Sequence, residues 1–284
     1  MVNIGMVNYI NTAPIYEIWK QHVHKPDWNV IEAPPSTLNR MLAADELDLG
    51  FVSSYEYAMR PDKYRILEDL SISANGPVGS VFLFSKVPFE HLSGKRVLLT
   101  GQSETSTALV KIILEEFYTI QPKYSIGEVF DYRNYDEDVV AVLAIGDEAL
   151  RLKIQDAYPF SMDLAEIWNK TTGLPFVFAL FVVREDFVNS FPAELTRIWL
   201  SLLECRQLGT DNLEEISRNV APRIPMSYDA CYNYLKTIQH NLGTKHKQAL
   251  EKFFSYLIQR GEADTNSLPL KFFPKNTRNH ETNI

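Results

Sequence analysis

The sequence is poor in the residues that build metal centres and disulfide frameworks. It holds two cysteines, Cys205 and Cys231, and six histidines among 284 residues. The cysteines are too far apart in the chain to form a metal-binding knuckle, and a single pair is a weak disulfide framework. No His-Glu-x-x-His pattern occurs, although that pattern is typical of one class of zinc enzyme. We therefore predict that the protein binds no metal.

Long apolar runs and basic runs are also missing. No apolar stretch approaches the roughly 18 residues that a membrane span needs. The formal net charge is −8, and no cluster of Lys or Arg could follow a phosphate backbone. The chain starts with a strand-like stretch and shows no basic or apolar leader. These features predict a cytoplasmic protein without membrane or nucleic-acid partners, although a locally positive pocket could still hold a small anion.

Short apolar runs alternate with helical patterns over much of the chain, as they do in α/β folds. Strands are expected at residues 4–7, 29–33, 49–52, 81–84, 96–99, 139–145 and 175–183. Helices are expected at residues 14–22, 38–44, 54–59, 108–117, 148–154, 193–205, 212–220, 228–242 and 246–259. Ser36 and Asp147 are expected to be N-caps, and the polar tail from Asn276 is expected to fray.

This order predicts two α/β lobes, with the chain passing between them twice. Lobe 1 would comprise residues 1–86 and 182–284, and lobe 2 would comprise residues 87–181. A cleft between two domains is a favoured place for a small ligand. The architecture therefore predicts where a ligand binds, but it does not define the chemistry.

Polar residues gather in four loops at the ends of predicted strands, around residues 8–12, 53–55, 75–80 and 101–107. Ligands of open α/β sheets bind outside the carboxyl ends of the strands, so these loops could line one site. The fourth loop leads into a helix, whose free N–H groups and dipole attract an anion. The candidate anion-binding residues are Ser103, Thr105, Ser106 and Thr107 in this loop, with Ser53 and Ser54 at the start of another helix.

Each loop also has a purely structural interpretation. Ser and Thr are common N-caps, so the hydroxyls before both helices could serve only to begin them. Gly79 would let the backbone approach a ligand closely, or it could simply form a tight turn. Asn11 follows the first strand and could bond to its own loop. The residues alone therefore leave a two-lobed binder of small anions as the interpretation.

The ordered set of blocks resembles the chorismate dehydratases of the futalosine route to menaquinone. The similar blocks are residues 7–11 with Pro14, 46–57, 70–81, 103–107, 145–150, 163–168 and 172–179. The resemblance implies a type II periplasmic-binding-protein fold, loss of water from chorismate to give 3-[(1-carboxyvinyl)oxy]benzoate, and no cofactor. It also implies that Asn11 and Ser80 are catalytic, and it leaves Asn8 as a weaker binding candidate.

We expect Ser103, Thr105 and Ser106 to hold one carboxylate of chorismate, and Ser53 and Ser54 to hold the other. Three further functions fit the scaffold. A ligand-sensing domain of a regulator is disfavoured because the chain carries no basic helix-turn-helix segment. A non-catalytic carboxylate-binding protein is disfavoured because the sequence shows no export signal. The sister enzyme, 1,4-dihydroxy-6-naphthoate synthase, is expected to carry a catalytic histidine in lobe 2. No histidine lies between His91 and His240, which favours the dehydratase.

Overall fold

The computed structural model describes residues 1–129, 138–156 and 158–274, so the predicted tail from Asn276 lies outside the described residues. The first sheet has the order β11-β4-β10-β3-β1-β2. Its strands are β1 (Val2–Val7), β2 (Trp28–Ala33), β3 (Leu49–Ser53), β4 (Tyr64–Ala74), β10 (Phe176–Arg184) and β11 (Phe272–Phe273). Strands β2 and β3 run parallel to β1, whereas β10 is antiparallel to both β3 and β4.

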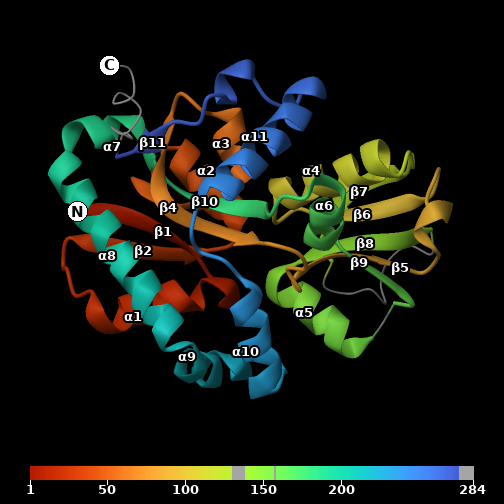
Figure 1. Ribbon diagram of the computed structural model, residues 1–284, viewed down its shortest axis with the longest axis horizontal. Helices are drawn as coiled ribbons and strands as arrows, with labels where there is room; N and C mark the ends of the chain where they lie inside the picture. Colours follow the sequence, from red (N-terminus) through yellow and green to blue (C-terminus); the bar gives the residue numbers. More distant parts are fainter. Residues whose placement is uncertain (130–137, 157, 275–284) are drawn as a thin grey trace, which may run out of the picture.

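The second sheet has the order β7-β6-β8-β5-β9. Its strands are β5 (Val81–Ser85), β6 (Arg96–Thr100), β7 (Lys123–Gly127), β8 (Val139–Ile145) and β9 (Phe160–Asp163). Strand β6 is parallel to β7 and β8, whereas β5 is antiparallel to β8 and β9. The two sheets form two bodies side by side, each with its own helices (Figure 1). The predicted α/β class is confirmed.

The helices divide between the bodies. The first body carries α1 (Ala13–His22), α2 (Pro35–Ala43), α3 (Ser54–Met59), α7 (Glu185–Ser190), α8 (Pro192–Asp211), α9 (Leu213–Val220), α10 (Tyr228–Thr237) and α11 (Thr244–Gln259). The second carries α4 (Glu104–Ile112), α5 (Gly146–Gln155) and α6 (Leu164–Thr172). Helix α4 continues as a π-helical turn over Ile113–Phe117.

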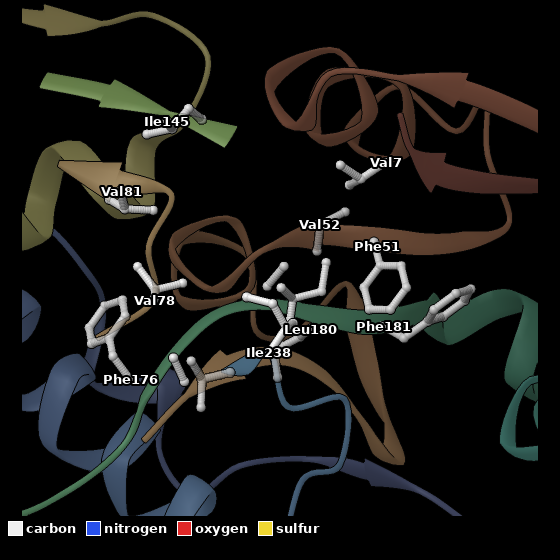
Figure 2. Close-up of a cluster of buried hydrophobic side chains, with 14 of the residues drawn as sticks. Val7, Phe51, Val52, Val78, Val81, Ile145, Phe176, Leu180, Phe181 and Ile238 are labelled. Carbon is white, nitrogen blue, oxygen red and sulfur yellow. The ribbon is translucent and has the colours of Figure 1, made fainter. Parts of the chain in front are cut away.

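Strands β3 and β10 form the centre of the first core. Every residue of β3 is buried, as expected for a strand that is covered on both faces. The rings of Phe51 and Phe181 meet edge to face with centroids 4.8 Å apart. Burying one such ring contributes about 1.5–3 kcal/mol. Figure 2 shows this cluster, together with Val78, Val81 and Ile145 on the side of the second sheet.

The structure corrects several predicted boundaries. Strand β5, which we expected in lobe 1, is hydrogen-bonded between β8 and β9 in the second sheet. All of β10 lies in the first sheet, including the residues before 182 that we expected in lobe 2. Sequence patterns indicate where a strand lies but not which strands it pairs with. They therefore could not locate the two points at which the chain passes from one lobe to the other. These points fall between β4 and β5 and between α6 and β10.

Two predicted N-caps are wrong. Helix α2 begins at Pro35, so Ser36 lies inside it, and helix α5 begins at Gly146, so Asp147 lies in its first turn. In both cases the helix already includes the residue before the expected cap. The predicted helix over residues 228–242 ends at Thr237, because the following residues pair with β4 through a bridge between Gln239 and Ser73.

Candidate functional site

A cavity of about 500 Å³, which includes its open mouth, lies between the two sheets. Its wall takes residues from all four of the polar loops that the sequence singled out. The polar side chains on this wall are those of Tyr9, Asn11, Ser53, Ser80, Ser103 and Ser106. Apolar residues such as Ile72, Val78 and Phe178 complete it. An apolar wall with a few converging polar groups is typical of a small-molecule site.

Three hydroxyls on the wall already accept hydrogen bonds from the protein. Ser53 Oγ accepts from Asn39 Nδ2 at 3.0 Å and from the Glu56 N–H at 3.2 Å. Ser80 Oγ accepts from the Tyr234 hydroxyl at 2.9 Å. Ser106 Oγ accepts from Ser103 Oγ at 3.1 Å. A serine hydroxyl that accepts in this way keeps its own proton for donation, so the cavity presents three neutral donors.

Asn11 supplies an acceptor. Its side-chain Oδ1 is buried and has no hydrogen-bond partner among the described residues. An unpaired buried acceptor costs about 1–3 kcal/mol, so such atoms usually find a partner. Because Asn11 lies on the cavity wall, a ligand hydroxyl could be that partner. The main-chain carbonyl of Asn11 is held from behind by His240 Nε2 at 2.7 Å.

Asp163 fixes the loop that carries Ser80. Its carboxylate accepts from the Val78 N–H at 3.2 Å and from the Gly79 N–H at 2.7 Å. It also caps helix α6 by accepting from two N–H groups of the first turn. Burial raises the pKa of Asp163, while these N–H groups lower it. Gly79 has a φ of +75°, which glycine adopts without a steric penalty. The loop is therefore tied to the second sheet immediately before Ser80.

Tyr9 connects the two sides of the cavity. Its hydroxyl donates to Gln102 Oε1 across 93 residues of sequence. Its ring lies against Gly146, where an added Cβ would come within 2.8 Å of a ring carbon. Burial and the charges of Asp147 and Glu148 raise the pKa of Tyr9, so the phenol remains a donor. Asp147 itself accepts from the Ile10 N–H at 3.3 Å.

The structure places the other predicted residues away from this cavity wall. Ser54 is fully buried and donates to the Val177 carbonyl at 2.8 Å. Thr105 Oγ1 accepts from the Tyr55 N–H at 2.9 Å, and Thr107 donates to the Thr100 carbonyl. Asn8 is exposed to solvent, and Gly79 contributes through its backbone turn rather than as a wall residue. Ser53 and Ser103 also serve as N-caps, because the side chain of each accepts a hydrogen bond from the N–H group three residues later.

Several supporting residues were not identified from the sequence. Asn39, Tyr234 and His240 contact candidate residues through long-range hydrogen bonds, and no local pattern marks them. Asp163 had a usable signal, because an Asp directly before a helical pattern is a typical N-cap.

The wall is neutral. None of the described residues that line the cavity carries a carboxylate, an imidazole or an amine. Within residues 1–129, 138–156 and 158–274, no three His, Cys, Asp or Glu side chains converge as metal ligands would. In the same ranges, no helix is both long and apolar enough to cross a bilayer. A charged ligand in this cavity would therefore contact hydroxyl, amide and main-chain dipoles rather than charged side chains.

Residues 2–259 match the family model described as menaquinone biosynthesis. The chorismate dehydratase of Thermus thermophilus is 32% identical, with 88% of this chain and 93% of that protein covered. The chorismate dehydratase of Campylobacter jejuni is 28% identical, with 88% and 94% covered. The 1,4-dihydroxy-6-naphtoate synthase of Thermus thermophilus is 21% identical, with 82% and 85% covered.

Solved structures resemble the fold. A protein from Archaeoglobus fulgidus has a TM-score of 0.75 at 19% identity, with 92% of this chain and 97% of that chain covered. The periplasmic aliphatic sulphonate binding protein of Escherichia coli has a TM-score of 0.66 at 12% identity, with 93% and 94% covered. The predicted periplasmic-binding-protein-like architecture is confirmed.

Proposed function

The chain belongs to the menaquinone biosynthesis family, and from this premise we propose that it is a chorismate dehydratase, a hydro-lyase. The observation that carries the proposal is the neutral cavity, which is lined by three serine hydroxyls that already accept hydrogen bonds and by the unpaired acceptor of Asn11. The greater identity to two chorismate dehydratases than to the sister synthase supports the same choice.

Chorismate carries two carboxylates and a ring that needs only the loss of water to become aromatic. The proton leaves the carbon that bears the enolpyruvyl ether, and hydroxide leaves the adjacent carbon. The intermediate carbanion is conjugated through a double bond to the ring carboxylate. Preorganised donors around that carboxylate stabilise the charge as it develops. Because the wall is neutral, hydroxyls and main-chain dipoles would supply this stabilisation.

We assign one carboxylate to Ser106 at the start of α4, whose hydroxyl accepts from Ser103, and the other to Ser53 at the end of β3. Ser80 donates to the leaving hydroxyl group, and Asn11 Oδ1 accepts the proton of that group. Ser53, Ser80 and Ser106 each accept a hydrogen bond from another side chain of the protein, and this leaves the serine's own hydroxyl proton available to the ligand. These bonds support the assignments. The proposal leaves Ser54, Thr105 and Thr107 with structural roles.

The base in this scheme is the enolpyruvyl carboxylate of the substrate. None of the described wall residues carries a carboxylate, an imidazole or an amine, and the raised pKa of Tyr9 keeps its phenol protonated, which supports this choice. The carboxylate removes the ring proton and returns it to the departing hydroxide, so the net products are the aromatic ether and one water. Orientation and exclusion of bulk water supply the remaining rate enhancement. An analogue without the side-chain carboxylate should bind but should not react.

The test is to mix purified protein with chorismate and follow the mixture by proton NMR. If the protein is a dehydratase, the signals of the hydrogens on the two saturated ring carbons disappear, and signals of aromatic hydrogens replace them. A non-catalytic carboxylate-binding protein would bind chorismate and return it unchanged, and that result would overturn the proposal. We also propose that the enzyme works in the cytoplasm, where its biosynthetic substrate is made, and cell fractionation tests this point.

A further inference from the structure

Two residues near the C-terminal end of the fold contact the candidate catalytic residues from behind. Tyr234 lies in α10, and its hydroxyl donates to Ser80 Oγ at 2.9 Å. His240 follows six residues later, and its Nε2 meets the Asn11 carbonyl at 2.7 Å. Both side chains are only 7% exposed. One short segment therefore contacts both residues that the proposed chemistry assigns to the leaving hydroxyl.

Tyr234 determines what the Ser80 hydroxyl can do. Burial raises the pKa of Tyr234, so its phenol stays protonated and acts as a donor. The ring also rests on the loop before Ser80, because a Cβ built on Gly79 would lie 3.4 Å from Tyr234 Cδ2. With one lone pair of Ser80 Oγ occupied by this bond, the Ser80 proton is left to point elsewhere. Ser80 lines the cavity, so a bound hydroxyl group is an available acceptor.

His240 holds the main chain of Asn11. Burial lowers its pKa to about 4, so the ring is neutral at pH 7. Only a protonated ring nitrogen can bond to a carbonyl oxygen, so Nε2 carries the hydrogen. The backbone around His240 is fixed to β4, because Ser71 N–H donates to the His240 carbonyl at 3.0 Å and Ser73 exchanges two hydrogen bonds with Gln239. The imidazole therefore fixes the turn from which Asn11 projects.

We propose that Tyr234 and His240 are positioning residues for the dehydration, with Tyr234 directing the proton of Ser80 into the cavity and His240 fixing the turn that carries Asn11. The inference rests on the proposed function and deepens it. It assigns a catalytic contribution to the segment between Tyr234 and His240, which otherwise serves as a support for the first sheet. Neither side chain touches the substrate in this scheme.

The effect of each residue should appear in kcat rather than in KM. The Tyr234→Phe substitution keeps the ring packing but frees the Ser80 hydroxyl to rotate, so part of the population presents a lone pair to the leaving group. The carboxylate contacts at Ser53 and Ser106 are unchanged. We expect kcat for chorismate to fall about 10- to 100-fold, somewhat less than the loss of a whole donor. KM should stay within about threefold, because ground-state contacts persist.

The experiment compares Tyr234→Phe with Tyr232→Phe, which removes a phenol hydroxyl from the same helix without touching the cavity. Both are also built on Ser80→Ala. If Tyr234 acts through Ser80, then Tyr234→Phe should change the rate by less than about twofold in that background, because effects on one shared interaction are not additive. Equal losses in both backgrounds would show that Tyr234 is merely structural and would overturn its role.

His240 has its own conservative pair. His240→Gln can keep a donor near the position of Nε2 and should retain at least about a third of kcat, whereas His240→Leu should lose about tenfold or more. Equal activity in the two variants would overturn the role of His240. If the wild-type protein leaves chorismate unchanged, the proposed function fails and this inference falls with it. If the wild type reacts and Tyr234→Phe matches it, only the inference fails.

Discussion

Asn39 and Ser53 exchange two hydrogen bonds of 3.0 Å. Asn39 Nδ2 donates to Ser53 Oγ, and the Ser53 N–H donates to Asn39 Oδ1. Both side chains are buried, with Asn39 in α2 and Ser53 at the end of β3. The pair fixes the end of β3. Because Ser53 Oγ accepts from Asn39, the Ser53 hydroxyl proton remains available for donation into the cavity. A side chain outside every predicted loop thus shapes the candidate site.

Replacing Asn39 with Leu keeps the approximate volume but removes both bonds. The Ser53 N–H then loses a buried partner, which costs about 1–3 kcal/mol, and the second lost bond adds to this. We expect the free energy of unfolding to fall by about 3 kcal/mol and KM for chorismate to rise. Urea denaturation and steady-state kinetics measure the two effects. Ser36→Ala in the same helix is the control and should change stability by less than about 0.5 kcal/mol. An equal effect of both substitutions would contradict the role of Asn39.

Gly146→Ala should damage the site through Tyr9. Gly146 has a φ of +57°, and its added Cβ would lie 2.8 Å from Tyr9 Cδ2, so the ring must move. Gly173 has a φ of +71° with nothing within 4 Å of an added Cβ, which makes Gly173→Ala a matched control. Both variants pay the left-handed backbone strain of about 1–2 kcal/mol. Only Gly146→Ala should lower kcat/KM, by about tenfold or more. Similar kcat/KM values for both variants would refute this account of Tyr9.

The pH dependence of stability should reveal the burial of His240. Its pKa is lowered by burial to about 4, against an ordinary 6.5, so between these values the unfolded chain binds a proton that the folded protein does not. This contribution is fully present above pH 6.5 and is lost as the pH falls towards 4. Between pH 7 and pH 5 the wild type should lose about 2 kcal/mol from this source.

The His240→Gln variant cannot take up this proton in its unfolded state, whereas its other titrating groups are the same as in the wild type. The gap between the unfolding free energies of the wild type and the variant should therefore narrow by about 2 kcal/mol from pH 7 to pH 5. Urea denaturation of both proteins at the two pH values measures the gap. A gap of the same size at both values would show that His240 is not held neutral by the fold.

Local patterns predicted several of the elements that border the cavity. The apolar run of β8 and the helix over Ser54–Met59 were placed to within a residue, because glycine or polar residues flank each of them: Asp138 and Gly146 flank β8, and Ser53 and Arg60 flank the helix. Strand β4 was missed, because Glu68 and Asp69 interrupt its apolar pattern and Asp69 has a φ of +60°.

The site shows the same limit. The four polar segments that the sequence singled out contain Asn11, Ser53, Ser80, Ser103 and Ser106, so sequence position alone suggested that these residues could meet. Ser54 and Thr105 stand beside them in the sequence, yet their side chains bond to Val177 and Tyr55 instead. One residue of displacement at a strand or helix end turns a side chain to another face, and no local pattern records which face a cavity occupies.

The central claim is that Asn11 and Ser80 act on the leaving hydroxyl of chorismate in a neutral cavity. The most direct test is the single-turnover rate of chorismate conversion by the wild type, Asn11→Ala and Ser80→Ala, with protein in excess over substrate. Each substitution should slow the reaction by about 10²–10³, as the loss of one preorganised group does, while chorismate still binds. Near-wild-type rates in both variants would contradict the account.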